Sequence, residues 1–315
     1  MEVALISVVI PAHREREVIG ATVSAVIAVM ETLAVDFEVI VVDDGSRDGT
    51  FEAVVQLHSD FPQVKAVRLS RQFGKEAAML AGLAHARGAA VVTIDGDLQH
   101  PPELIPEMVR AWRAGAHIVH GVKKTRLYGG RFHRTAARLF NTVFSWVAGF
   151  DIVGSSDFKL LDARVARLLV ERFPEHGRFH RGLSTWVGFD QVTVPFEVRE
   201  RVGGQSRWRL SALFAYAWNT LTAYSSLPLK LVPVMGALML IVSLVLGGEA
   251  VISRLLGRSI SGFATLEITI LFTGSMIMIG LGIIGQYLAR MYDELKQRPM
   301  YLVAEQVGFE PRKKA

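Results

Sequence analysis

The chain has no cysteine among its 315 residues. Disulfide bonds and thiolate metal sites are therefore excluded, although this absence does not fix the cellular compartment. The first residues, Met1 to Pro11, also lack a basic segment and a small-residue cleavage site, so they do not resemble a secretory signal. We expect a strand there, and we expect the domain that follows to stay in the cytoplasm.

Charged residues are nearly absent from two long apolar stretches, Leu231–Ile252 and Phe263–Leu288. The only charged residues in them are Glu249 and Glu267. Each stretch is close to the roughly 20 residues needed to cross a bilayer. The short linker between them predicts a transmembrane hairpin; the alternative is a pair of buried helices in a soluble protein. An apolar content of 50% and a mean hydropathy of +0.31 favour a mixed architecture of soluble domain and membrane segment.

Basic residues flank both ends of the predicted hairpin, whereas its linker offers only Arg254 and Arg258. This asymmetry predicts that both termini lie in the cytoplasm and that the protein is a multi-pass protein of the inner membrane. The predicted domains are a catalytic domain over 1–207, an interfacial juxtamembrane helix over 208–226, the hairpin over 227–290 and a basic tail over 291–315. Alternating arginines and aromatics near 131–150 predict a second interfacial amphipathic helix, or else a helix that packs on a sheet.

The first 120 residues alternate between β-branched runs and helical stretches, which predicts an α/β domain with a mostly parallel sheet flanked by helices. The predicted strands are Ile6–Ile10, Glu38–Val42, Ala66–Leu69, Ala90–Ile94 and His117–His120. The predicted helices are Arg16–Leu33, Thr50–Asp60, Lys75–Ala86 and Pro102–Ala114.

Acidic side chains follow two of these strands, at the sheet edge where open α/β sheets bind ligands. Asp95 and Asp97 flank Gly96 and together suit Mg²⁺ or Mn²⁺, which prefer oxygen ligands and often retain phosphate oxygens. Such an ion would stabilise a leaving diphosphate. Alone the pair is a weak signal, because many such pairs are solvated turns. The carboxylate of Asp44 could accept hydrogen bonds from a base or ribose. The alternative is that Asp44 forms a turn and caps the helix that follows.

Four motifs in order resemble glycosyltransferase family 2, and more narrowly the polyprenyl-phosphate glycosyltransferases. This group includes dolichyl-phosphate mannose synthases and bacterial undecaprenyl-phosphate glucosyltransferases. The likeness covers nearly the whole chain, including the hairpin. The motifs are Ser7-Val8-Val9-Ile10-Pro11, Val41-Val42-Asp43-Asp44-Gly45-Ser46, Ser70-Arg71-Gln72-Phe73-Gly74-Lys75-Glu76-Ala77 and Asp95-Gly96-Asp97-Leu98-Gln99-His100-Pro101-Pro102.

The resemblance implies a GT-A fold and an inverting hexosyl transfer from a nucleotide sugar to a polyprenyl phosphate. The residues that it assigns to the nucleotide are Pro11, Glu15, Asp44, Lys75, Asp95, Gly96 and Gln99, with Asp95 and Asp97 as metal ligands. Relatives commonly have Tyr-Asn-Glu where this chain has His13-Arg14-Glu15, so an aromatic contact from position 13 to the base is in doubt.

Asp157 matches the aspartate that is the candidate base of the resembling glucosyltransferases. A phosphate monoester has a second pKa of about 6 and is largely a dianion at neutral pH, so it needs little deprotonation. Asp157 therefore has two further interpretations: it orients the sugar or metal, or it caps a turn.

An anionic acceptor needs cations, and two basic segments supply candidates. The candidate acceptor-phosphate residues are Arg201, Ser206, Arg207, Lys123, Arg126 and Arg134. The same charges also suit anionic lipid headgroups.

The motifs also bear on other functions. A processive polysaccharide synthase carries Gln-x-x-Arg-Trp, whereas Gln205-Ser206-Arg207-Trp208 has one residue too few, and two spans do not form a channel. A different acceptor, a GDP-mannose donor and a non-catalytic scaffold stay open. We expect a UDP-sugar such as UDP-glucose, a lipid phosphate and the membrane as partners, no nucleic acid, and an oligomer of unspecified order.

Overall fold

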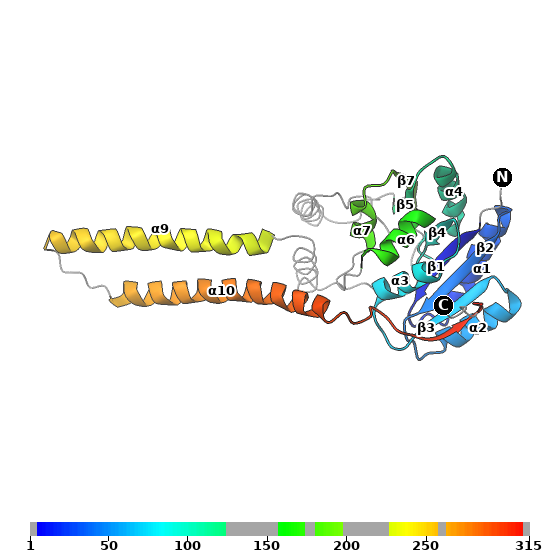
Figure 1. Cartoon of the computed structure of the whole chain (residues 1–315), viewed down its shortest axis with the longest axis horizontal. Coiled ribbons are helices and arrows are strands. Elements are labelled where there is room, and N and C mark those ends of the chain that lie inside the picture. The colour runs from blue at the N-terminus through cyan, green and yellow to red at the C-terminus, as the bar shows by residue number, and fades with distance from the viewer. Residues whose placement is uncertain (1–4, 124–156, 174–179, 198–226, 258–262, 311–315) are drawn as a thin grey trace. The chain divides into compact units, whose positions relative to one another are not determined.

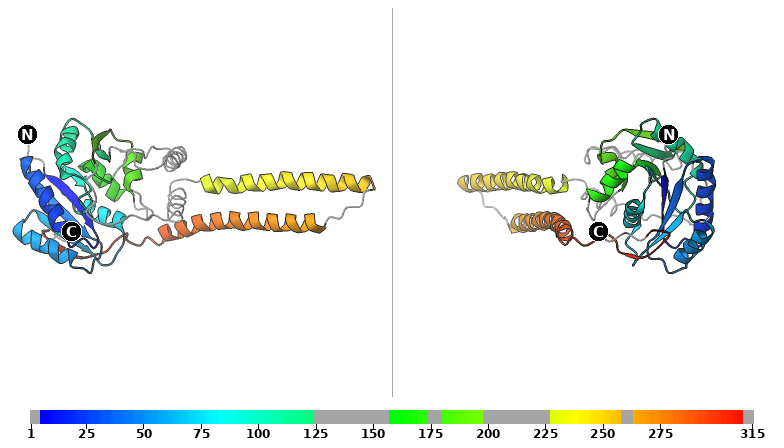
Figure 2. Two further views of the ribbon diagram at one scale, coloured as in Figure 1. Left: turned by 180° about the vertical axis from the view of Figure 1, so that it is seen from behind. Right: turned by 45° about the vertical axis from the view of Figure 1, so that its right-hand side comes forward.

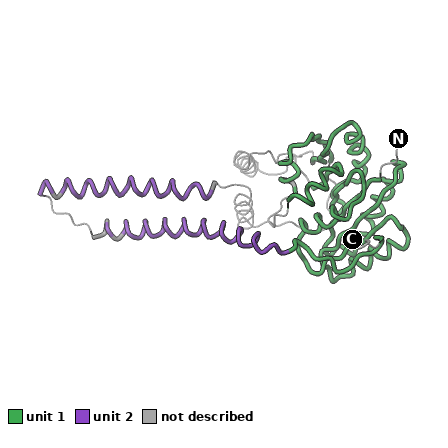
Figure 3. Tube along the Cα trace, in the orientation of Figure 1, with its two compact units in different colours: residues 1–145, 150–206, 299–315 green, residues 146–149, 207–298 purple. Residues whose placement is uncertain are grey.

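The structure is a computed structural model that describes residues 5–123, 157–173, 180–197, 227–257 and 263–310. The described chain falls into two compact units (Figure 3). Unit 1 contains the described residues up to 197 together with 299–310. Unit 2 contains the described residues from 227 to 298.

Unit 1 begins with the predicted alternation of strands and helices, with ends that shift by a few residues (Figure 1). Its first elements are β1 (Ile6–Ala12), α1 (Ile19–Thr32), β2 (Phe37–Asp43), α2 (Thr50–Asp60), β3 (Val64–Leu69), α3 (Lys75–His85), β4 (Ala90–Thr93), the 3-10 turn η1 (Pro102–Leu104), α4 (Ile105–Arg113) and β5 (Ile118–Lys123). The later elements are β6 (Lys159–Asp162), α6 (Ala163–Glu171), α7 (His180–Trp186), β7 (Gln191–Phe196) and β8 (Val303–Val307).

The strands of unit 1 form one mixed sheet in the order β7-β5-β6-β4-β1-β2-β3-β8. The central strands β4, β1, β2 and β3 pair in parallel, as the alternation predicts. Towards its edges the sheet is mixed: β6 runs antiparallel to both β4 and β5, β8 runs antiparallel to β3, and β5 and β7 pair in parallel. A mixed sheet flanked by helices is the architecture that the resemblance to GT-A enzymes implies.

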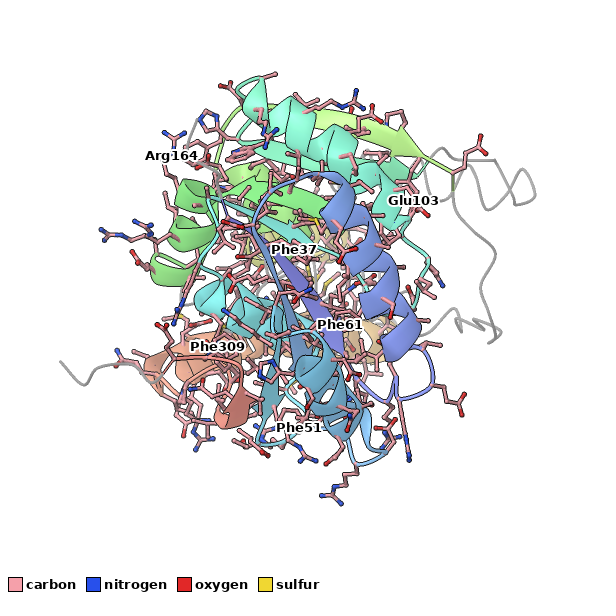
Figure 4. The ribbon with its side chains drawn as sticks, turned by 90° about the vertical axis from the view of Figure 1, so that its right-hand side faces the viewer. Phe37, Phe51, Phe61, Glu103, Arg164 and Phe309 are labelled. Atoms are coloured by element: carbon pink, nitrogen blue, oxygen red, sulfur yellow. The ribbon has the colours of Figure 1, made fainter. Side chains whose placement is uncertain are left out.

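Helices cover both faces of this sheet (Figure 2), because each central strand is apolar on both sides. Val8 and Val39 pack with α1, α2 and α4 in one core cluster. On the other face, Gly82 of α3 lies so close to Val9 and Val42 that a β-carbon would collide with Val9. Each buried aliphatic side chain contributes roughly 1.5–3 kcal/mol, so the two faces hold the strand ends rigidly. Phe37, Phe51 and Phe61, labelled in Figure 4, belong to the first of these layers.

Unit 2 contains two long helices, α9 (Leu227–Leu255) and α10 (Phe263–Leu295), which lie side by side (Figure 1). Within segments Pro228–Ser253 and Ile268–Leu295, an 18-residue stretch has a mean hydropathy of 2.4 and 2.1, respectively, and 0% and 11% of that stretch is buried. The alternative of buried helices in a soluble core does not fit such exposed apolar surfaces. The two helices are long and apolar enough to cross a membrane, and the protein is membrane-associated.

The C-terminal segment differs from the basic tail that the sequence predicts over 291–315. α10 continues to Leu295, and Val303–Val307 forms β8 at the edge of the catalytic sheet. The Ser70 backbone N–H donates to the carbonyl of Leu302 at 2.8 Å, which extends the pairing. β8 is short and largely exposed, and its sequence Val-Ala-Glu-Gln-Val lacks the apolar alternation that marks a strand. The predicted interfacial helices near 131–150 and over 208–226 lie outside the described residues.

Candidate active site

The site lies where the carboxyl ends of β1, β2 and β4 meet. Parallel register places Ala12 opposite Asp43 and Val9 opposite Thr93, so the turns after these strands share one edge of the sheet. The Thr22 hydroxyl donates to the carbonyl of Gly96 at 2.6 Å and ties the turn after β4 to α1. This register brings the residues after three separate strands into one cluster, as the motif spacing predicts.

Asp44 holds a neighbouring loop. Its two carboxylate oxygens accept hydrogen bonds from the backbone N–H groups of Phe73 and Gly74 at 2.7 and 2.8 Å. Gly45 has a φ of +66°, and a β-carbon there would collide with the backbone of Arg71. The turn after β2 and the loop before α3 are therefore fitted to each other, with the buried Asp44 as the link. Its contact with a nucleoside stays a prediction.

Lys75 joins two carboxylates that are far apart in the sequence. Its ammonium lies 2.5 Å from Oδ1 of Asp95 and 2.8 Å from Oδ2 of Asp157. The Thr93 hydroxyl donates to the backbone carbonyl of Asp157 at 2.6 Å and fixes that residue beside the end of β4. Burial of Lys75 lowers its pKa, but the two carboxylates outweigh burial and raise the pKa above its usual value. The sequence assigned Lys75 to the nucleotide and did not predict this bridge.

Glu15 lies against the same cluster. Its Oε2 atom is so close to Gly96 that a β-carbon there would collide with it. Burial, followed by the charges of Asp97 and Asp95, raises the pKa of Glu15 to about 7. Within the described part of the chain, this Oε2 is buried and lacks a hydrogen-bond partner. Three carboxylates thus crowd one edge of the sheet, where a cation would relieve their repulsion.

The donor set fits a divalent ion held by few protein ligands. Asp95 and Asp97 offer carboxylate oxygens, and the Gln99 backbone N–H donates to Oδ1 of Asp97 at 3.1 Å, which orients that side chain. Among the described residues, no group of three or more histidine or acidic side chains forms a complete metal site. An ion here would take Asp95 and Asp97 and complete its shell with phosphate oxygens and water, as Mg²⁺ commonly does.

His100 supports Asp95, a role that motif reasoning missed. The buried imidazole is stacked on Phe158 at 5.2 Å and lies edge-on to Phe196 at 5.8 Å. Its Nδ1 accepts a hydrogen bond from the Asp95 backbone N–H at 3.4 Å. The ring therefore fixes the backbone of Asp95. In the sequence, the only sign of this role is that His100 belongs to the same motif as Asp95.

A buried polar layer supports Asp157. Lys159 begins β6 two residues further on, is fully buried, and donates from Nζ to Oγ of Ser184 at 2.7 Å. Burial raises the pKa of Glu76, while a hydrogen bond from the His180 backbone N–H to its Oε2 at 2.9 Å acts in the opposite direction. Nothing in a single sequence marks a lysine as buried, so this layer was not predicted.

Several predicted site residues lie outside the described parts of the chain, so their positions stay predictions. These residues are Arg126, Arg134, Arg201, Ser206 and Arg207. Lys123 ends β5, but its side chain also lies outside the described parts.

Comparison with known proteins identifies the family. The model of Glycosyl transferase family 2 matches residues 7–158. An uncharacterized glycosyltransferase of Synechocystis sp. is 36% identical over 97% of this chain and 96% of its own length. This chain belongs to glycosyltransferase family 2.

Another relative of this family 2 glycosyltransferase is a bactoprenol glucosyl transferase of Shigella phage SfII. It is 33% identical over 95% of this chain and 97% of its own length. Among solved structures, mannosyl-3-phosphoglycerate synthase from Rubrobacter xylanophilus is similar with a TM-score of 0.48 and 20% identity. That similarity covers 70% of this chain and 72% of the synthase.

Proposed function

We propose that this glycosyltransferase transfers a hexose, with inversion, from a UDP-sugar such as UDP-glucose to a polyprenyl phosphate at the cytoplasmic membrane face. The product is a polyprenyl-phosphate sugar. The observation that carries the proposal is the cluster of Glu15, Asp95, Asp97 and Asp157 at the ligand edge of the sheet, in a chain that also has two helices long and apolar enough to cross a membrane. The bactoprenol glucosyl transferase that is similar over nearly the whole chain supports the lipid acceptor.

The donor would lie across the carboxyl ends of β1, β2 and β4. Asp95 and Asp97 would hold Mg²⁺ or Mn²⁺ on its diphosphate, and such an ion stabilises the charge of the leaving nucleoside diphosphate. Glu15 and Asp44 follow β1 and β2 at this edge of the sheet, where a nucleoside would bind. The anionic cluster alone would repel a diphosphate, so the site needs a cation for this donor.

Asp157 is better suited to hold a reactant in place than to remove a proton. The acceptor phosphate is already largely a dianion above a pKa of about 6. In addition, Asp157 is buried and its carboxylate is paired with Lys75 at 2.8 Å. We infer that Asp157 orients the sugar and Lys75, while the nucleophile is the acceptor phosphate oxygen itself.

The strand pairing in the sheet favours a topology in which both ends of the hairpin lie on the same side of the membrane. β8 follows the hairpin and pairs with β3 of the catalytic unit. The chain before α9 and the chain after α10 therefore belong to one folded unit, which requires an even number of crossings. The basic residues at both flanks favour the cytoplasmic side.

The test is a transfer assay with purified full-length protein in detergent. Radiolabelled UDP-glucose, UDP-galactose, UDP-N-acetylglucosamine and GDP-mannose are each incubated with undecaprenyl phosphate, with and without Mn²⁺. We expect chloroform-extractable label from a UDP-sugar, dependent on Mn²⁺ or Mg²⁺ and abolished by Asp97→Asn. Label from GDP-mannose alone would show that the donor is GDP-mannose and not a UDP-sugar. Absence of label from every donor, or full activity of the variant, would contradict the proposal.

A further inference from the structure

Lys75 occupies a position that helix electrostatics do not favour. It is the first residue of α3, where the positive end of the helix dipole stabilises anions and opposes a cation. Gly74, with a φ of +102°, leads the chain into this turn. The carboxylates of Asp95 and Asp157 compensate for this unfavourable position, since each lies within 3 Å of the Lys75 ammonium.

This ammonium contacts an oxygen that a metal ion would also need. Oδ1 of Asp95 lies 2.5 Å from Nζ of Lys75, and Mg²⁺ binds carboxylate oxygens at about 2.1 Å. An ion on this oxygen would be a near neighbour of the ammonium, and like charges at such distances in a partly buried site repel strongly. Metal binding therefore requires Lys75 to move away from Asp95 or requires new negative charge beside it.

Both conditions are available in the site. Oδ2 of Asp157 lies 2.8 Å from the same ammonium, so Lys75 retains a partner when it leaves Asp95. The diphosphate of a nucleotide sugar adds negative charge next to both cations and relieves their repulsion. The metal would thus bind well only when a diphosphate is present.

We propose that Lys75 is an internal counter-ion that keeps the metal affinity of the free enzyme low and couples metal binding to the arrival of the nucleoside diphosphate. The inference deepens the proposed function and rests on the Asp95–Asp97 metal site within it. Lys75 acts as a positioning residue through Asp95, and Asp157 is the carboxylate that retains it.

The experiment measures Mn²⁺ binding by electron paramagnetic resonance of the free ion, with full-length protein in detergent, alone and with saturating UDP or GDP. In the wild-type protein we expect a diphosphate to tighten Mn²⁺ binding at least tenfold. Lys75→Met is expected to bind Mn²⁺ at least tenfold more tightly than wild type without nucleotide, and the diphosphate then adds little. Asp157→Asn is expected to bind Mn²⁺ several-fold more weakly without nucleotide, because Lys75 then has Asp95 as its remaining carboxylate partner of the two and pairs with it more strongly.

Two controls accompany these variants. Arg110→Met removes one positive charge from an exposed position on α4 and is expected to leave Mn²⁺ affinity unchanged. Lys75→Arg retains the charge and is expected to keep the diphosphate dependence, and it provides a second measurement where Lys75→Met does not fold. A thermal melt of each variant identifies any loss of fold.

The outcomes separate this inference from the proposed function. Weaker or unchanged Mn²⁺ binding in folded Lys75→Met, or loss of the diphosphate dependence in Lys75→Arg, would overturn the counter-ion role. If Asp97→Asn abolishes Mn²⁺ binding while Lys75→Met leaves it unchanged, only the role of Lys75 fails. If wild-type protein binds no Mn²⁺ with either diphosphate, the metal site of the proposed function fails with it.

Discussion

At the scale of single residues, two glycines in the site are needed for different reasons. A β-carbon at Gly45 would meet the backbone of Arg71, which has little freedom to move, and its φ of +66° disfavours other residues. A β-carbon at Gly96 would collide with the end of the Glu15 side chain and would make an ordinary contact with the Pro11 carbonyl oxygen. Substitution at Gly45 therefore disturbs the fold, whereas substitution at Gly96 displaces one carboxylate.

Gly96→Ala is predicted to impair donor binding without unfolding the protein. The new methyl group pushes the Glu15 carboxylate from its place beside Asp95 and Asp97, so we expect the KM for the nucleotide sugar to rise about tenfold. The free energy of unfolding should change by less than about 1 kcal/mol, because a flexible side chain yields. Steady-state kinetics and thermal melts check both parts. Gly20→Ala, with open space around it in α1, is the matched control, and an unchanged KM for Gly96→Ala would contradict the role of Glu15.

His120 is predicted to make the catalytic unit sensitive to mild acid. Burial, followed by the charge of Lys159, lowers its pKa to about 4, whereas an unfolded histidine has a pKa of about 6.5. Between these values the unfolded chain binds more protons, so stability is lost as the pH falls from about 6.5 to about 4. The loss is roughly 1–3 kcal/mol.

Chemical denaturation at pH 7 and at pH 5 measures this loss. His120→Gln retains a donor for Gln191, whose side-chain oxygen lies 2.9 Å from Nε2 of His120, and it removes the titrating group. We expect a smaller difference in stability between the two pH values for this variant. An equal difference in variant and wild type would show that other groups cause the acid sensitivity.

At the scale of elements, β8 connects the segment after α10 to the β3 edge of the sheet. It pairs with β3, and Glu305 lies 4.0 Å from Arg68. Arg68 in turn donates to the Ser46 carbonyl at 3.3 Å in the turn after β2. Beyond β8, the ring of Phe309 packs on His85 at 5.1 Å. The edge strand thus supports the loop that carries Asp44.

Truncation after Arg298 is predicted to destabilise the catalytic unit. It removes the pairing with β3 and the Phe309 contact, which leaves an unpaired edge. We expect the free energy of unfolding to fall by about 2–4 kcal/mol, measured by thermal melts in detergent. A chain that ends at Glu310 retains every described contact and serves as the control. Equal stability of the two truncated chains would show that β8 contributes nothing.

At the scale of the whole molecule, the pairing of β8 with β3 predicts a topology. We expect both ends of the predicted hairpin to emerge on one side of the membrane, and the segment between α9 and α10 to lie on the other. Because the chain has no cysteine, single cysteines report each side. Arg113→Cys and Glu310→Cys should react with a membrane-impermeant maleimide in inside-out vesicles, and Leu256→Cys in right-side-out vesicles. Labelling of Arg113→Cys and Glu310→Cys from opposite sides would contradict this topology.

The parts of the fold that could be predicted are those with a local signal. Continuous apolar strands such as β2 and the long apolar helices carry their own periodicity, and motifs place Asp95 and Asp97 at a strand end. β6 and β8 could not be placed, because a strand's direction and partner depend on segments far away in the chain. The supporting roles of His100 and Lys159 could not be predicted either, because the burial of a side chain also depends on segments far away in the chain.

The sequence by itself determined the class of the protein: an α/β catalytic unit with acidic residues at its ligand edge, followed by two apolar spans. These features follow from local periodicity and residue chemistry. Only the tertiary structure decided that Lys75 bridges Asp95 and Asp157, and that the chain after the hairpin returns as β8. Asp157 lies more than 80 positions from Lys75 in the sequence, and β8 lies more than 200 positions from β3. No local pattern specifies contacts over such separations.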